Sequence, residues 1–182
     1  AKVTGYLSLE MELTPDRLGP IDGSRGALFI KEQVKNAGHS TQGAIAVSYL
    51  HHSGRRWTLE HLWPEIAYSG VFGEPANAGG EVRRFGSAPL YLATGEWCGM
   101  GECSDCISAI SLAPSGPHFL GEVMGGAWYP AEGSNPTSDT CETYGYTAEI
   151  RPLTTATGVF SVTYDGWTAP PKALTPKARF HL

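Results

Sequence analysis

The chain has 182 residues, which is enough for one domain of ordinary size with its own apolar core. Its formal net charge is −5, and its 13 Lys and Arg residues are scattered, so we expect no nucleic-acid partner. No apolar run approaches the roughly 18 to 20 residues that a membrane-spanning helix requires, so we expect no membrane partner either. Charged residues are few, at 17%, whereas Gly, Pro and aromatic residues are plentiful, and this composition favours strands and turns.

Strand patterns dominate the first part of the chain. Residues 3–13 alternate between apolar and polar side chains, which predicts a strand. The Pro and Gly residues between positions 15 and 26 then predict a break in regular structure. A short apolar run at 27–30 predicts a second strand, and residues 31–36 suit a helical turn.

A hairpin is predicted next. Residues 43–50 are almost continuously apolar, as in a strand that is covered on both faces. After Ser53 and Gly54, residues 57–63 alternate until Pro64. Residues 70–89 lack periodicity apart from 81–85, so a surface loop or an edge segment is expected there.

The second half continues in the same way. Further strands are predicted over residues 90–94, 107–112, 119–124, 141–152 and 158–164. Residues 125–140 are predicted to form a loop. Roughly eight to ten short strands with little helical periodicity predict an all-β fold, an antiparallel β-sandwich or barrel-like jelly roll with little helix. We expect one β-sandwich binding domain over residues 1–168 and a C-terminal tail or linker over residues 169–182.

The cysteines allow three interpretations. Cys98, Cys103 and Cys106 fall within nine residues, and Cys141 follows at a distance. The Cys-x4-Cys-x2-Cys spacing matches the ligands of a plant-type [2Fe-2S] cluster, whereas a four-thiolate zinc site usually has two Cys-x2-Cys pairs. The composition favours an oxidising compartment, so we expect disulfides, with one bridge from the cluster to Cys141 and one local bridge. The connectivity stays open. We therefore expect no cofactor and no metal.

The sequence contains no catalytic pattern that stands out. There is no Gly-x-Ser-x-Gly nucleophile motif, and the acidic pairs are of a kind that any acidic β-protein contains. His51 and His52 are adjacent, so on a strand they point to opposite faces, and we interpret the histidines as ordinary surface or hydrogen-bonded residues.

Aromatic side chains provide the better candidate for a binding site. Their flat faces can stack on the apolar side of a sugar ring while nearby Asp and Asn side chains bind its hydroxyl groups. Within the polar, Gly-rich stretch 125–140, the candidate ligand-binding residues are Trp128, Tyr129, Asn135 and Asp139.

One family resemblance follows from the C-terminal strands. Gly-Tyr-Thr-Ala-Glu-Ile-Arg-Pro152 followed by Gly158-Val-Phe-Ser-Val-Thr-Tyr164 is similar to the last two strands of the receptor-binding, lectin-like domain of a chaperone-usher pilus tip adhesin. The start at Ala1, which fits a mature secreted protein, the sparse cysteines and the aromatic residues in loops also resemble that family.

The resemblance implies a non-catalytic domain for cell adhesion, secreted through the periplasm to a fimbrium on the cell surface. Its implied partners are a host glycan or surface receptor and a pilin subunit, which it would contact through a domain following Leu182. Two alternatives stay open: a secreted polysaccharide-active enzyme on a β-sandwich, and a [2Fe-2S] electron-transfer protein that uses the four cysteines.

Overall fold

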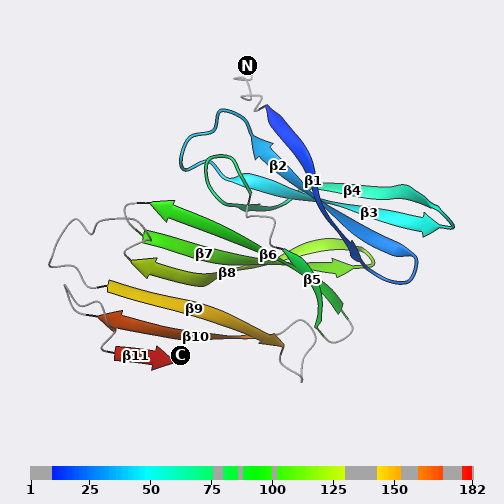
Figure 1. The fold of residues 1–182 in the computed structure, drawn as a ribbon. Helices are drawn as coiled ribbons and strands as arrows, with labels where there is room; N and C mark the ends of the chain where they lie inside the picture. Colours follow the sequence, from blue (N-terminus) through cyan, green and yellow to red (C-terminus); the bar gives the residue numbers. More distant parts are fainter. Residues whose placement is uncertain are drawn as a thin grey trace, which may run out of the picture.

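The protein is an all-β molecule built from antiparallel sheets. In the part of the chain that the computed structural model describes, every regular element is a strand, and the strands form two sheets (Figure 1). The sandwich-like all-β fold with little helix is therefore confirmed. None of the described residues belongs to a helix long and apolar enough to cross a membrane. The described residues are 10–75, 80–85, 88–99, 102–129, 143–152, 160–169 and 178–181.

The smaller sheet has four strands in sequence order. They are β1 (Met11–Pro20), β2 (Arg25–Val34), β3 (Gly43–Ser53) and β4 (Arg56–Ser69). The continuous apolar run of β3 is buried over residues 43–49, as predicted for a strand covered on both faces. The predicted hairpin is also present, because β3 and β4 pair from Ser53 and Arg56 onward.

Three local predictions in this sheet are wrong. β1 continues through the predicted break, with a register shift between Pro15 and Arg17, because an edge strand tolerates proline where the inner ladder does not. β4 likewise passes Pro64 at an irregular part of its register. β2 runs on to Val34 instead of turning helical, since its residues pair with strands on both sides.

The larger sheet has seven strands in the order β11-β10-β9-β8-β7-β6-β5, each antiparallel to its neighbours. β11 falls within the predicted tail and extends the sheet by pairing with β10. The strands are β5 (Glu81–Phe85), β6 (Ala88–Gly99), β7 (Glu102–Ala113), β8 (Gly116–Tyr129), β9 (Thr143–Pro152), β10 (Phe160–Ala169) and β11 (Ala178–His181).

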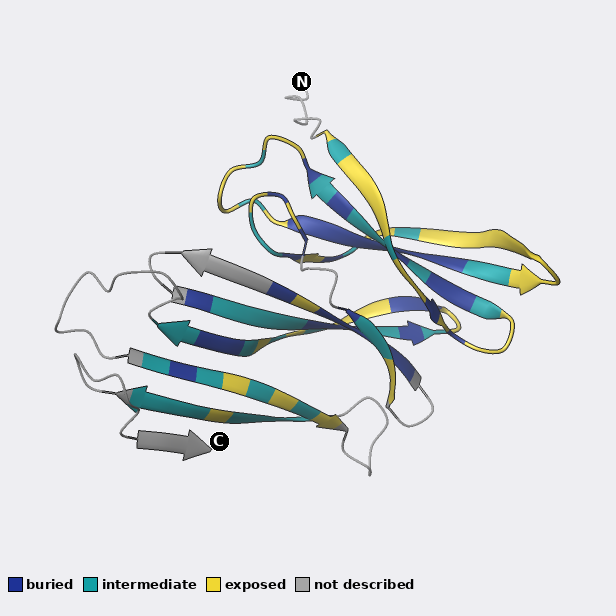
Figure 2. Cartoon of the chain, viewed as in Figure 1, coloured by how far each residue is buried: buried dark blue, intermediate teal, exposed yellow. Residues whose placement is uncertain are grey.

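The main core lies where the smaller sheet meets one half of the larger sheet (Figure 2). Phe29 of β2 and Tyr91 of β6 are both buried, and their rings stack with centroids 3.6 Å apart. The Tyr91 hydroxyl donates a 3.0 Å hydrogen bond to Asp16, the extra residue at the irregularity in β1. The Tyr49 hydroxyl donates a bond of 2.8 Å to the carbonyl oxygen of Ala113, so both buried tyrosines have partners.

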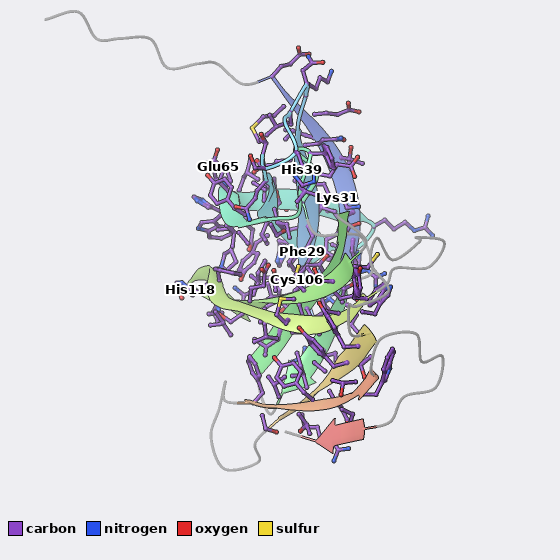
Figure 3. The ribbon with its side chains drawn as sticks, turned by 90° about the vertical axis from the view of Figure 1, so that its left-hand side faces the viewer. Phe29, Lys31, His39, Glu65, Cys106 and His118 are labelled. Carbon is purple, nitrogen blue, oxygen red and sulfur yellow. The ribbon has the colours of Figure 1, made fainter. Side chains whose placement is uncertain are left out.

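The other half of the larger sheet extends beyond this core. β9, β10 and β11 lie away from the smaller sheet in both views of the ribbon (Figures 1 and 3). A second, smaller cluster of buried side chains from β6 and β7 has Phe160 of β10 packed against it. Its members Leu90 and Leu92 alternate with Tyr91, so they point to the face of β6 opposite the main core.

The stacked ring of Phe29 can be tested by truncation. Phe29→Ala is expected to lower the free energy of unfolding by about 3 to 5 kcal/mol, because it leaves a cavity between the two sheets. Phe119→Ala, at a ring that is 42% exposed, is the matched control and should cost less than about 1 kcal/mol. Urea denaturation followed by tryptophan fluorescence measures both, and equal losses would contradict this account of the core.

Candidate ligand-binding site

Cross-strand register places two tryptophans on either side of a glycine. Trp128 of β8 lies opposite Gly145 of β9, and Gly145 lies opposite Trp167 of β10. Directly opposite residues in an antiparallel pair project to the same face of the sheet. The two indole rings therefore share one face, with a position that carries no side chain between them.

Gly145 makes room for this arrangement. A Cβ atom added at Gly145 would lie 2.9 Å from Nε1 of Trp167 and 3.0 Å from two of its ring carbons, so the Trp167 ring leans over the glycine. The result is an open pocket of about 430 Å³, which we call the tryptophan slot. The slot is lined by Ala127, Trp128, Gly145, Tyr146, Thr147, Asp165, Gly166 and Trp167.

Polar side chains occupy the next position along the same face. Thr147 lies opposite both Gly126 and Asp165, two residues along each strand from the tryptophan row. Thr147 and Asp165 are exposed, whereas Gly126 is buried. A Cβ added at Gly126 would lie 3.7 Å from Oδ2 of Asp105, so a second carboxylate borders this row. Aromatic faces next to a hydroxyl and carboxylates suit a ligand that has both apolar faces and hydroxyl groups.

The structure separates the residues that the sequence grouped together. Trp128 lines the slot, but Tyr129 is the next residue on β8 and points to the opposite face. There its ring stacks on the ring of Tyr144, with the two ring centroids 6.2 Å apart. Both lie at the end of a strand rather than in the predicted loop. Asn135 and Asp139 lie outside the described residues.

Sequence reasoning missed Trp167, Gly145, Thr147 and Asp165 as members of the site. Strands were predicted over residues 141–152 and 158–164, so the signal for β9 and β10 was present. The pairing of Trp167 with Gly145 depends on the register between those strands, which no local pattern reveals.

The cysteine-rich stretch is a hairpin rather than a ligand loop. Cys98 near the end of β6 lies directly opposite Cys103 near the start of β7. Cys103 and Cys106 are three residues apart on one strand, so their side chains point to opposite faces. They cannot converge on one iron-sulfur cluster or zinc ion, and this removes the [2Fe-2S] alternative that used Cys98, Cys103, Cys106 and Cys141.

Cys106 corrects the expectation that every cysteine forms a bridge. It is a free thiol, whereas Cys141 lies outside the described residues. Burial raises the pKa of the Cys106 thiol, and the Glu122 carboxylate raises it too because it repels the thiolate; together they bring this pKa to about 11. Cys106 is therefore a protonated, unreactive thiol at neutral pH.

Three of the described histidines have separate aromatic or acidic neighbours. His52 packs against Trp57 with ring centroids 4.5 Å apart, His61 packs against Trp63 at 4.3 Å, and Nδ1 of His51 lies 3.8 Å from Glu60. Across residues 10–75 and the described segments that follow, no three His, Cys, Asp or Glu side chains gather in an arrangement that could hold a metal ion.

Comparisons of this chain with known protein families, with curated proteins and with solved structures find no match. The candidate site is therefore defined by the geometry of this structure alone, that is, by Trp128, Trp167 and the polar row beside them.

The state of the Cys106 thiol can be tested by alkylation. In the folded protein, iodoacetamide is expected to modify Cys106 very slowly near about pH 7, and faster as the pH rises toward about 11, because only the thiolate reacts. The same protein in denaturant is the control, since its thiol regains an ordinary pKa near about 8.5 and should react readily. Mass spectrometry measures both rates, and equally fast labelling of the folded and denatured forms at neutral pH would contradict the raised pKa of this thiol.

Proposed function

We propose that this chain is a non-catalytic carbohydrate-binding domain that serves cell adhesion. The observation that carries the proposal is the tryptophan slot, in which Trp128 and Trp167 flank Gly145 on one face of the larger sheet. Indole rings stack on the apolar faces of sugar rings, and the missing side chain at Gly145 gives room to the Trp167 ring that lines the slot.

The polar row beside the slot supports the same ligand class. Thr147 offers a hydroxyl group and Asp165 a carboxylate, and both are exposed next to the indole rings. Such groups form hydrogen bonds with sugar hydroxyls and orient a ligand that stacking alone would leave free to rotate.

One described carboxyl group with a raised pKa lies away from the slot. A glycosidase needs a carboxyl group that stays protonated near the scissile bond. Burial raises the pKa of Glu32, but Glu32 lies in β2 of the smaller sheet, where it accepts a hydrogen bond of 3.1 Å from the Glu65 backbone. That carboxyl group belongs to the sheet scaffold and not to the slot.

The wider setting of the proposal comes from the sequence resemblance to the receptor-binding domain of a chaperone-usher pilus tip adhesin. In that setting the chain is the receptor-binding domain at the tip of a bacterial fimbria, exported through the periplasm, with a host glycan or surface receptor as ligand. A pilin subunit, contacted through a further domain, is the second proposed partner.

Because the composition favours an oxidising compartment, we also propose a local disulfide between Cys98 and Cys103. Directly opposite residues of an antiparallel pair have Cα atoms about 4.5 to 5.5 Å apart, which is within the range that a disulfide spans. Cys103, in contrast to Cys106, is not a free thiol. Peptide mapping without reductant is expected to join the peptides that contain these two residues, and a bridge from Cys103 to Cys141 would overturn the assignment.

Removal of either indole ring is expected to weaken glycan binding. Trp128→Ala and Trp167→Ala should each lower affinity by about 10- to 100-fold, because each removes one stacking surface of the slot. Trp57→Ala is the matched control, since this ring is 47% exposed on β4 of the smaller sheet and should not affect binding. A glycan array identifies a retained sugar, and titration calorimetry then measures the variants.

A second variant tests the shape of the slot without removing a ring. Gly145→Ala places a methyl group against Trp167 and should weaken binding of the same sugar while the strands stay paired. Unchanged binding by all three slot variants would remove this site from the proposal. Recovery of shortened oligosaccharide would instead favour a polysaccharide-active enzyme.

A further inference from the structure

The smaller sheet has a second face that the main core does not use. Phe29 of β2 and Val47 of β3 belong to the core, and side chains alternate along a strand. Their neighbours Leu28, Ile30 and Ser48 therefore point to the opposite face, which we call the outer face. An antiparallel sheet that meets water on its second face normally carries polar side chains there.

Apolar side chains occupy the outer face instead. Leu18 of β1 lies opposite Leu28, and Leu28 lies opposite Ser48. Ser48 in turn lies opposite Leu62 of β4, and directly opposite residues share a face. Figure 2 shows the exposed edge strands β1 and β4 on either side of the more buried β2 and β3. The large apolar residues of β1 and β4 that are exposed, by 45% to 63%, all lie on this face: Leu13, Leu18, Trp57, Leu59, Leu62 and Tyr68.

The outer face carries little charge. Among the described residues that the strand register places on this face, Glu32 alone carries a formal charge. Its side chain is buried and accepts a 3.1 Å hydrogen bond from the backbone nitrogen of Glu65. The Glu65 carboxylate accepts a bond of 2.7 Å from the Tyr68 hydroxyl. Both carboxylates have partners within the chain, so this face can be covered without leaving a buried charge unpaired.

The edges of the smaller sheet disfavour the addition of another strand. β1 and β4 are its edge strands, and each has an irregularity in its register. β1 contains Pro15 and Pro20, and β4 contains Pro64. Proline has no N–H group to donate to a new ladder. A partner of this sheet is therefore expected to meet its outer face rather than its edges.

The apolar area of the outer face is close to what a stable dimer needs. At about 200 Å² for each fully exposed residue of this size, its six exposed large residues present on the order of 600 Å². That value is at the upper end of the apolar patches found on monomers, about 300 to 600 Å². The exposed Pro15 and Pro20 and the half-buried Leu28, Ile30 and Leu50 add to it. The total approaches the area of about 800 Å² that each partner contributes to a stable interface.

We propose that the outer face is a dimer interface, on which a second copy of this chain packs its own outer face. One surface then serves both copies, as a two-fold symmetric dimer requires. The second copy supplies a face of equal area and equally low charge, which suits homodimer interfaces because they are more apolar than other interfaces. The two outer faces would pack as the sheets of a sandwich do.

Such a dimer leaves the tryptophan slot open. Leu92 points away from the main core and lies opposite Ala109 of β7. Asp105 is four residues from Ala109, so it shares that face, and it lies opposite Gly126. Gly126 lies opposite Thr147 of the slot. The slot and the dimer interface are thus on different sheets, each on the face that points away from the main core, and the dimer inference does not depend on the proposed function.

Sedimentation equilibrium of the unmodified full chain tests the dimer. The mass is expected to be twice the 19.5 kDa of one chain, with a dimer dissociation constant of about 10 µM or lower. A species of 19.5 kDa at every concentration up to about 100 µM would overturn the dimer. Flotation of that monomer with phosphatidylcholine vesicles, lost in Leu59→Lys with Leu62→Lys, would assign the outer face to a lipid surface instead.

Two double variants locate the interface. Leu59→Lys with Leu62→Lys, at exposed positions of β4, should raise the dimer dissociation constant by about 100-fold, because two ammonium groups would be buried without partners. Leu13→Lys with Leu18→Lys should do the same from β1, at the other edge of the same face. Far-UV circular dichroism checks that each variant keeps its strands.

The matched control places the same two charges on the larger sheet. Leu120→Lys with Met124→Lys replaces two exposed apolar residues of β8 and should dimerise as the unmodified chain does. A folded Leu59→Lys with Leu62→Lys variant that dimerises with unchanged affinity would overturn the proposed interface. Equal weakening of the dimer by the control would also overturn it, because added charge anywhere on the chain would then have the same effect.

Discussion

The stacking of Phe29 on Tyr91 is the contact on which the arrangement of the two sheets depends. It joins the second strand of the smaller sheet to β6, and the surrounding buried side chains close the same core. Because this core uses only one half of the larger sheet, β9, β10 and β11 extend beyond it (Figure 1). Strands that do not pack in the main core have a face that can carry the side chains of a binding site.

Strands rather than loops hold the proposed site. Trp128, Gly145 and Trp167 lie on three neighbouring strands, and backbone hydrogen bonds fix the spacing between them. A ligand meeting such a surface does not have to order a flexible segment, so less of the interaction free energy is lost on binding. The absence of a side chain at Gly145 matters as much as the presence of the rings, since a methyl group there would contact Trp167.

The cysteines show how strand geometry can overrule spacing in the sequence. Three sulfurs within nine residues match the ligands of a cluster only if the segment folds as a loop. Here the segment folds as the β6–β7 hairpin, and alternation sends Cys103 and Cys106 to opposite faces. Cys98 lies directly opposite Cys103 in the strand register instead, which suits the proposed local bridge, and Cys106 is a half-buried free thiol.

Local sequence determined the β character of this protein. The apolar run of β3, the alternation of β9 and the turn residues along the chain predicted most strands, because alternation and turn chemistry act over a few residues. Trp128 became a candidate for another reason, as an aromatic residue in a polar, Gly-rich stretch that was predicted to be a loop. Only the tertiary structure decided that Trp167 lies opposite Gly145 and that Tyr129 points away from Trp128. It also decided that β1 and β4 continue past proline residues, which they can do because both are edge strands. Register between strands is set by pairing across the sheet, and a slip of one residue would turn every side chain to the other face.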